Sequence, residues 1–505
     1  MFNLVRNELT KIFRKKGIYI VLVIFLILSS LMLGLQKYGE SMTWETMHDG
    51  TIQYLQDELT KIDTSTKEGK EQHLRIQAEL ELYQLAIQYG GYSTWQGRMI
   101  FEDIWPIKMD MVTYENNLEN SAQHTMYNKK ELQQQYDKIM ERIEKGDWRS
   151  FVEEDLKDAQ DQIAEIEKTL ETTTDAKTIK ELNKNIEILK VEEQVNKWRL
   201  EKDIAYEDKE YDNTLQRYSS CANRLIESNY QHNINETNYL EKETEEFGYS
   251  AKIEYQNTLE EFKISKYRIE NNKPNLANTS SAYTLENFIT EIGLLFIIII
   301  SILITATIVS DEFNKGTIKL LLIRPYTRRK IMFSKVIASI ISIIISIIAI
   351  ILIQTVIAGI FYGFDTMNIP VIQYNFNTNN VVEMNVFVWL TINLLCVSPI
   401  IIILSAIALM VGTIFANSAS AISIGILTNM GASILQTIAI YYGAKIKWLR
   451  LIPFVNWDLT QVLNGRLSQI EGATLPIAIT SCLILLIIIR TITFENFARK
   501  NIKNV

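Results

Sequence analysis

The sequence predicts an all-α polytopic membrane protein with six transmembrane helices and a large α-helical domain inserted between the first two. Six apolar stretches are long enough, or nearly so, to cross the roughly 30 Å of hydrocarbon in a bilayer. The segment 37–291 is polar instead, with 31 Lys and Arg against 51 Asp and Glu, whereas the rest of the chain has 20 against 8. The overall net charge of −8 therefore hides two parts of opposite charge.

The apolar stretches set the expected spans. The first is not expected to be a signal peptide, because its apolar run is too long and no small-residue cleavage site follows it. The uncharged tract 384–444 is too long for one helix, and "FANSAS" (415–420) predicts a turn that divides it. The expected spans are 17–35, 292–309, 336–363, 386–411, 421–441 and 473–489.

The distribution of Lys and Arg predicts that both termini are cytoplasmic. Cations gather in the N-terminal segment 1–16, in the connector 310–335 between spans 2 and 3, and in the tail 490–505. With six spans, all three segments fall on the same side of the membrane. The connector 364–385 has no Lys or Arg, as expected outside. The connector 445–472 is the exception, because it carries four cations although parity places it outside.

The inserted segment 37–291 is expected to form an extracellular domain, because long domains translocate largely regardless of their charge. Ile163, Ile166 and Leu170 precede the loop 172–176, and a second apolar series at helical spacing follows it. This pattern predicts an antiparallel hairpin of two helices with a coiled-coil-like seam. The acidic surface has two interpretations, which are solubility and attraction of a cationic ligand such as an antimicrobial peptide.

The sequence contains no recognisable nucleotide-binding, metal-binding or catalytic motif, so no cofactor, nucleic-acid partner or enzymatic activity is expected of this chain. The spans as drawn contain no Asp, Glu, Lys or Arg, which argues against an ion-coupled carrier. Their neutral polar residues indicate either packing between helices or a substrate path. The candidates for a substrate path are Asn393, Asn429, Ser433 and Gln436.

Two segments on the expected cytoplasmic side have amphipathic patterns. The segment 1–16 has apolar residues at helical spacing with cations opposite, which predicts an interfacial helix. In the connector 310–335, the stretch 313–323 predicts a short helix with an acidic start, an apolar face and a cationic face. Pro325 ends this helix, and Thr327 is the expected N-cap of span 3. The connector is either a docking element for a partner protein or a positive-inside anchor only.

The connector sequence "DEFNKGTIKLLLIRPYTRRKIMFSK" resembles the signature that follows the second span of ABC-2-type permeases, the membrane subunits of ATP-driven exporters. The amphipathic N-terminal segment, the six spans and the cytoplasmic ends also fit that family, over roughly 1–36 and 285–505. The segment 445–472 looks like the family's extracellular re-entrant hairpin, which would explain its cations. The matching connector positions are Glu312, Gly316, Thr317, Leu320, Leu321, Pro325, Thr327, Arg328, Ile331 and Lys335.

The resemblance implies a transport subunit in a bacterial plasma membrane that docks a separate ATP-binding subunit, which is present in two copies in such complexes. ATP and Mg²⁺ would be bound by that partner, and the permease would pair with a second copy or with a sister permease among the membrane lipids. The residues that the resemblance assigns to ATPase coupling are Asp311, Glu312, Lys315, Gly316, Thr317, Lys319, Leu320, Arg324, Pro325 and Arg328.

The expected function is export of an amphiphilic substrate, with an antimicrobial peptide as the first candidate. The alternative is a non-transporting scaffold or receptor with an extracellular helical stalk, similar to the phage-infection proteins. An ATP-binding subunit encoded beside this chain would favour the transporter, and its absence would favour the scaffold.

Overall fold

The computed structural model describes residues 1–41, 44–91, 94–115, 129–205, 209–242, 247–273, 275, 280–317 and 326–500. It is mostly helical, and it contains six helices that are long and apolar enough to cross a membrane. The chain divides into two compact units. Unit 1 comprises Met1–Gln36, Leu240–Glu260 and Leu276–Val505, and unit 2 comprises Lys37–Tyr239 and Glu261–Asn275.

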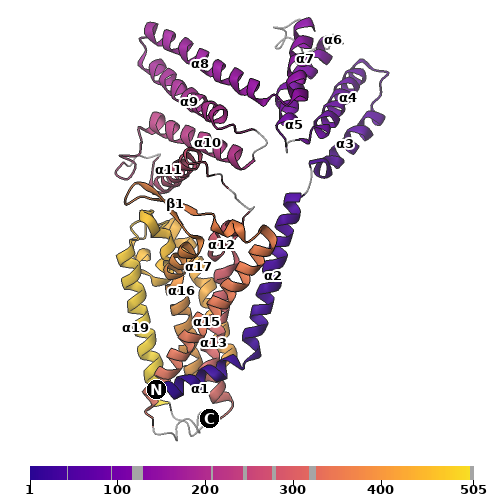
Figure 1. Ribbon diagram of the computed structural model, residues 1–505. Coiled ribbons are helices and arrows are strands. Elements are labelled where there is room, and N and C mark those ends of the chain that lie inside the picture. The colour runs from indigo at the N-terminus through magenta and orange to yellow at the C-terminus, as the bar shows by residue number, and fades with distance from the viewer. Residues whose placement is uncertain are drawn as a thin grey trace. The chain divides into compact units, whose positions relative to one another are not determined.

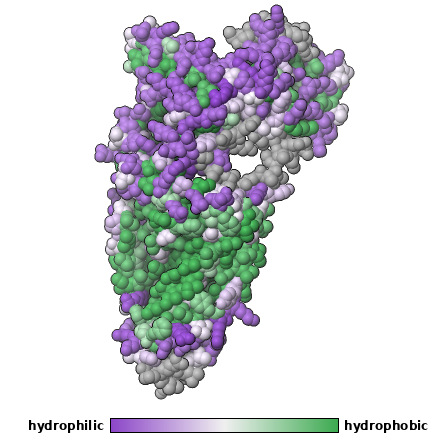
Figure 2. All heavy atoms as spheres, viewed as in Figure 1, coloured by the Kyte–Doolittle hydropathy of each residue, from purple (hydrophilic) through white to green (hydrophobic). Residues whose placement is uncertain are grey.

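The six candidate spanning helices give unit 1 a continuous apolar band (Figures 1 and 2). The predicted turn at "FANSAS" is confirmed, because one helix ends at Phe415 and the next begins at Ser418, with Asn417 as its N-cap. Several helices extend beyond the apolar stretches that predicted them. Their bounds are α2 Lys16–Ser41, α13 Leu294–Asn314, α15 Arg328–Tyr362, α16 Val386–Phe415, α17 Ser418–Tyr442 and α19 Leu475–Arg499.

The helix α13 is the centre of unit 1. Within its most apolar window 67% of the residues are buried, against 17% for α17 and for α19. Two glycines allow neighbouring helices to approach it closely: a Cβ at Gly412 of α16 would lie 3.0 Å from the Ala306 carbonyl oxygen, and one at Gly425 of α17 would lie 3.0 Å from Ile302. Small residues at such crossings are typical of helices that pack inside a membrane.

Shorter elements of unit 1 lie before and between these helices. The predicted amphipathic helix at the N-terminus is confirmed as α1 (Phe2–Phe13). The helix α12 (Ser281–Glu286) and the π-helical turn η4 (Ile289–Gly293) lead into α13. The connector before α16 contains the 3₁₀ turn η5 (Asp365–Asn368) and an antiparallel hairpin, β1 (Val371–Asn375) and β2 (Asn380–Met384).

The β-hairpin was not expected from the sequence, which predicted helices alone. Its strands contain Val and Ile, and its turn is rich in Asn, with Asn379 in the left-handed region at φ +51°. Both features are typical of hairpins. The segment 445–472 contains three short elements, which are η6 (Lys447–Leu451), α18 (Pro453–Asn456) and η7 (Leu459–Gly465).

The connectors of unit 1 separate into two groups. The Phe376 amide donates to the Asn464 carbonyl at 2.8 Å, so the connectors 364–385 and 445–472 meet each other. The segment 1–16, the start of the connector 310–335 and the C-terminal end of α19 meet at the opposite ends of the spanning helices (Figure 1). The three cationic segments identified in the sequence therefore gather together.

The described residues of unit 2 form helices joined by loops. The predicted hairpin is confirmed as α8 and α9, which pack along each other on the two sides of the loop at 173–175. A second group of helices surrounds the buried ring of Trp95. The bounds in this unit are α3 Trp44–Lys61, α4 Lys67–Gln88, α5 Trp95–Met99, η2 Ile100–Ile104, α6 Trp105–Glu115, α7 Lys129–Lys145, α8 Trp148–Thr172, α9 Ala176–Glu201 and α10 Lys209–His232, while α11 (Tyr249–Glu270) contributes to both units.

The close approach of α17 to α13 predicts that Gly425→Leu destabilises unit 1. The added side chain would meet Ile302, and overpacking of this kind costs about 1–3 kcal/mol in the free energy of unfolding. Gly431→Leu on the same helix is the matched control, because a Cβ there meets no atom within 4 Å. Thermal unfolding of the purified chain should show a lower midpoint for Gly425→Leu only. Equal midpoints for the two variants would contradict this packing.

Candidate functional site

The connector 310–335 begins inside α13 rather than after it. Phe313 and Asn314 are the last residues of that helix, Lys315 is its C-cap, and Gly316 follows at φ +68°. The predicted helix therefore does not start at Phe313, because α13 continues five residues beyond the predicted end of span 2. The left-handed conformation of Gly316 turns the chain away from the axis of α13 and so ends the helix. Glycine suits this position because a residue with a Cβ is strained there.

Four charged side chains form a buried ionic cluster where α1, α13 and α15 meet. The Lys335 ammonium group on α15 lies 3.0 Å from Glu8 Oε2 on α1 and 2.7 Å from Glu312 Oε2 on α13. It also donates to the Ile308 carbonyl oxygen at 3.1 Å. Lys11 closes the cluster, at 3.0 Å from Glu8 Oε1 and 2.6 Å from Glu312 Oε1. Two carboxylates thus face two ammonium groups.

Burial makes the cluster energetically demanding. The Lys335 side chain is 0% exposed, and those of Glu8 and Glu312 are 5% and 8% exposed. Buried charges are tolerated only when they are paired and hydrogen-bonded, because their hydration has been lost. Each carboxylate here contacts both ammonium groups, so the three helices are stable in this arrangement only together.

The lysines of α1 and of the turn after it have shifted pKa values. Partial burial lowers the pKa of Lys11, but the hydrogen bond and charge of Glu312 and the charge of Glu8 outweigh it, so the pKa is raised. Burial lowers the pKa of Lys15 below its ordinary value, although the Asp311 carboxylate lies 2.9 Å from its ammonium group. The pair of Lys15 and Asp311 extends the cluster towards the connector.

The other end of the connector is held by a second set of contacts. Thr327 caps α15 as predicted, accepting a hydrogen bond from the Lys330 amide. The Arg328 guanidinium donates to the carbonyl oxygens of Ala498 and Lys500 at 2.9 and 3.0 Å, at the end of α19. The Lys500 ammonium group in turn donates to Thr413 and Ile414 of α16 and lies 4.6 Å from the centre of the Phe313 ring.

The residues assigned to ATPase coupling fall into three groups. Asp311, Glu312 and Arg328 are held by contacts within unit 1. Lys315, Gly316 and Thr317 are exposed. Lys319, Leu320, Arg324 and Pro325 lie outside the described residues.

The sequence did not predict the ionic cluster. Glu8 lies on the buried face of α1 together with Val5 and Ile12, and this acid on an otherwise apolar face was the available signal. Lys335 was counted only as the last cation of the connector, whereas α15 begins at Arg328 and carries it inward by two turns. Its pairing with a residue 327 positions earlier has no local sequence pattern.

The predicted substrate-path residues lie on two helices and in different surroundings. Asn393 of α16 is buried, and its amide donates to the Trp389 carbonyl of its own helix at 3.0 Å. Asn429, Ser433 and Gln436 of α17 are exposed or partly exposed, on a helix that buries little of its surface. Their polar row is therefore available to a neighbour outside this chain.

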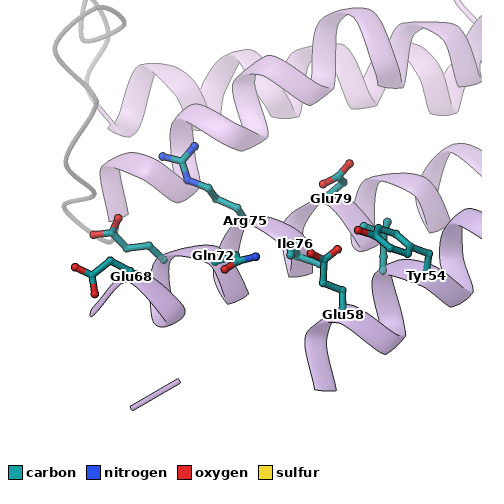
Figure 3. A pocket seen from close by; sticks show the side chains of 9 residues that line it. Tyr54, Glu58, Glu68, Gln72, Arg75, Ile76 and Glu79 are labelled. Carbon is teal, nitrogen blue, oxygen red and sulfur yellow. The ribbon is translucent and has the colours of Figure 1, made fainter. Parts of the chain in front are cut away.

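Unit 2 contains an acidic groove between α3 and α4 (Figure 3). Its volume is about 560 Å³, and the aromatic ring of Tyr54 and the Arg75 guanidinium also line it. Burial and the charge of Glu58 raise the pKa of the Glu79 carboxyl group. The carboxylates of the groove come from Glu58, Glu68, Glu71 and Glu79.

Comparisons with known proteins agree with the membrane class that the six apolar helices define. A family model described as "Protein of unknown function (DUF2705)" matches residues 258–503. The uncharacterized protein YhcI of Bacillus subtilis is 30% identical over 257 residues, which cover 50% of this chain and 79% of the relative. The uncharacterized membrane protein YdbK of the same organism is 29% identical over 199 residues, covering 38% and 75%. No solved structure matches.

The chain is a membrane protein, and its described residues include six helices of spanning length. It belongs to the same family as YhcI.

The ionic cluster predicts a large effect of Lys335→Met. Removal of this cation leaves two buried carboxylates with Lys11 alone, and an unpaired buried charge costs about 3–5 kcal/mol in the free energy of unfolding. Lys330→Met is the matched control, because Lys330 lies on the same helix and is exposed. Thermal unfolding in detergent should show a lower midpoint for Lys335→Met alone.

A double variant separates pairing from packing. Adding Glu8→Gln to Lys335→Met restores the balance of charge, so the second change should cost less than it does in the wild-type chain. Additive effects of the two substitutions would refute the coupling between these helices.

Proposed function

We propose that this chain is the permease subunit of an ATP-driven exporter in a bacterial plasma membrane. The observation that carries the proposal is the connector 310–335, which resembles the ABC-2-type signature and is anchored at both of its ends. Glu312, near the start of the connector, and Lys335, at its end, form a buried ion pair at a distance of 2.7 Å. A force applied to the exposed residues between them would therefore act on α1, α13 and α15 together, as a coupling element requires.

The proposed topology places both termini and this connector in the cytoplasm, with unit 2 as an extracellular domain. Its support is the excess of cations in three segments that also contact one another. Arg466, one of the cations that opposed this orientation, forms a salt bridge with the buried Glu260 carboxylate and so has a structural role. The segment 445–472 would then lie in the outer leaflet as a re-entrant element.

The proposed mechanism needs a partner, because no nucleotide-binding motif was found in this chain. Two ATP-binding subunits would bind ATP and Mg²⁺. The exposed residues of this chain that such a subunit would contact are Lys315, Gly316 and Thr317. A second permease, identical or a sister chain, would pack against the polar row of α17. The row would then border the path of the substrate between the two permeases.

The proposed substrate is a cationic amphiphile such as an antimicrobial peptide. The segment 37–291 has 20 more acidic than basic residues, and this excess raises the local concentration of cations. Four of these carboxylates and the Tyr54 ring line the groove between α3 and α4 (Figure 3). A cationic peptide with an apolar face matches both parts of that lining.

Docking of the ATPase predicts a selective effect of Lys315→Glu. The substitution reverses one exposed charge in the connector and should reduce co-purification of an ATP-binding subunit expressed with this chain, without loss of membrane insertion. Lys330→Glu is the control, because it makes the same change at an exposed site that is not among the residues assigned to ATPase coupling. Equal co-purification of both variants would refute docking through this surface, and the absence of any ATP-binding partner would favour the scaffold function.

The substrate proposal predicts that glutamine at the four groove glutamates lowers the resistance of cells to cationic peptides. The control replaces four exposed hairpin residues, Glu153, Glu165, Glu167 and Glu171, with glutamine, which changes the net charge equally. Growth inhibition by a cationic peptide is the measurement. A loss confined to the groove variant supports binding in the groove, an equal loss supports general attraction, and no loss in either variant contradicts the substrate class.

A further inference from the structure

A short amphipathic helix, η6, lies at the mouth of an apolar groove in unit 1. In a 3₁₀-helix, residues three apart lie on one face. Trp448 and Leu451 therefore share a face, and they are 63% and 57% exposed. Lys447 and Arg450 share the adjacent face, and no carboxylate in the described part of the chain pairs with either.

The groove itself runs along the first half of α19. It has a volume of about 600 Å³ and an almost wholly apolar lining, interrupted by the hydroxyl groups of Thr480 and Ser481. From Pro476 to Ile488 it covers about 18 Å of helix at about 1.5 Å per residue, which matches one leaflet of a bilayer core roughly 30 Å thick. The remaining lining residues are Leu451, Pro453, Ile477, Ile484 and Leu485.

The mouth of the groove is held firmly by its own packing. Leu449 and Val455 are buried against Ala439 and Ile470, which fixes η6 and α18 to the end of α17. The Asn456 amide donates to the Arg450 carbonyl oxygen. The cationic face and the groove are therefore parts of one rigid surface.

The aromatic residues near η6 indicate its depth in the membrane. Tyr441 and Tyr442, at the end of α17, are exposed together with Trp448. Exposed Trp and Tyr at the ends of spanning helices are typical of the interface between hydrocarbon and lipid headgroups. The cations of η6 thus lie at headgroup level, and the groove extends from them into the hydrocarbon.

We infer that this surface binds an anionic phospholipid, with the phosphate-bearing headgroup on Lys447 and Arg450 and an acyl chain in the groove along α19. The occupant is a lipid rather than a cationic peptide, because the polar face at the mouth is itself cationic. An apolar groove at leaflet depth next to two cations matches the two parts of such a lipid. The inference does not depend on the proposed transport activity.

Native mass spectrometry of the full chain in detergent tests the site, with phosphatidylglycerol and phosphatidylcholine of identical acyl chains as probes. Each cation near a headgroup contributes about fivefold in affinity for an anionic lipid. The wild-type chain should therefore retain phosphatidylglycerol in preference to phosphatidylcholine, and Lys447→Gln should reduce that preference about fivefold. Arg450→Gln should act similarly, but Arg450 also packs against Gly472, so Lys447→Gln decides the outcome if that variant fails to fold.

The groove is tested by Ile484→Trp, which fills it and should reduce retention of both lipids. Ile487→Trp is the control, because Ile487 is exposed on the same helix but does not line the groove. Equal retention of the two lipids by the wild-type chain would overturn the inference. Unchanged lipid retention in Lys447→Gln and Ile484→Trp would also overturn it. A change in the oligomeric state of these variants, without a change in lipid retention, would indicate that a second protein chain covers this surface.

Discussion

The buried ion pairs around Lys335 are the interaction on which the arrangement of the membrane unit depends. Lys335 is fully buried, and its ammonium group contacts carboxylates from two other helices, α1 and α13. Burial of Lys335, Glu8 and Glu312 is unfavourable unless their charges are paired, and the half-exposed Lys11 completes the cluster. It fixes the N-terminal helix, the central helix and the start of α15 relative to one another, although none of these helices is adjacent to both of the others in sequence.

The same contacts anchor both ends of the connector 310–335. One of its ends is the last turn of α13, which packs against α15, α16 and α17 and has the most buried apolar window of the six candidate spanning helices. The other end is joined to α19 and α16 through Arg328 and Lys500. A movement of either anchored end would reach the neighbouring helices, because packed helices move as rigid bodies. A partner protein that binds the exposed residues after α13 would act on most of the membrane unit.

The family model covers mainly one of the two units of the chain. The family model covers residues 258–503, so most of unit 2 lies outside the part that it describes. The matched relative YhcI is also a shorter protein, since half of this chain covers 79% of it. The inserted unit is thus the feature in which this chain differs from the family model, and its acidic groove is the natural place to seek a specialised role. The cations of the connector 445–472 belong instead to unit 1, through Arg466 with Glu260 and through the surface formed by η6.

The sequence by itself determined the six apolar helices, the turn at 415–420, the N-cap at Thr327 and the hairpin of α8 and α9, because these follow from local hydrophobic periodicity and capping chemistry. It did not determine where α13 ends, the β-hairpin at 371–384 or the ionic cluster. Glu8 and Lys335 are 327 positions apart, and only the packing of three helices brings their charges together. The sequence predicted Glu312 as a docking residue. In the tertiary structure it is a buried partner of two lysines, and this pairing compensates for its lost hydration.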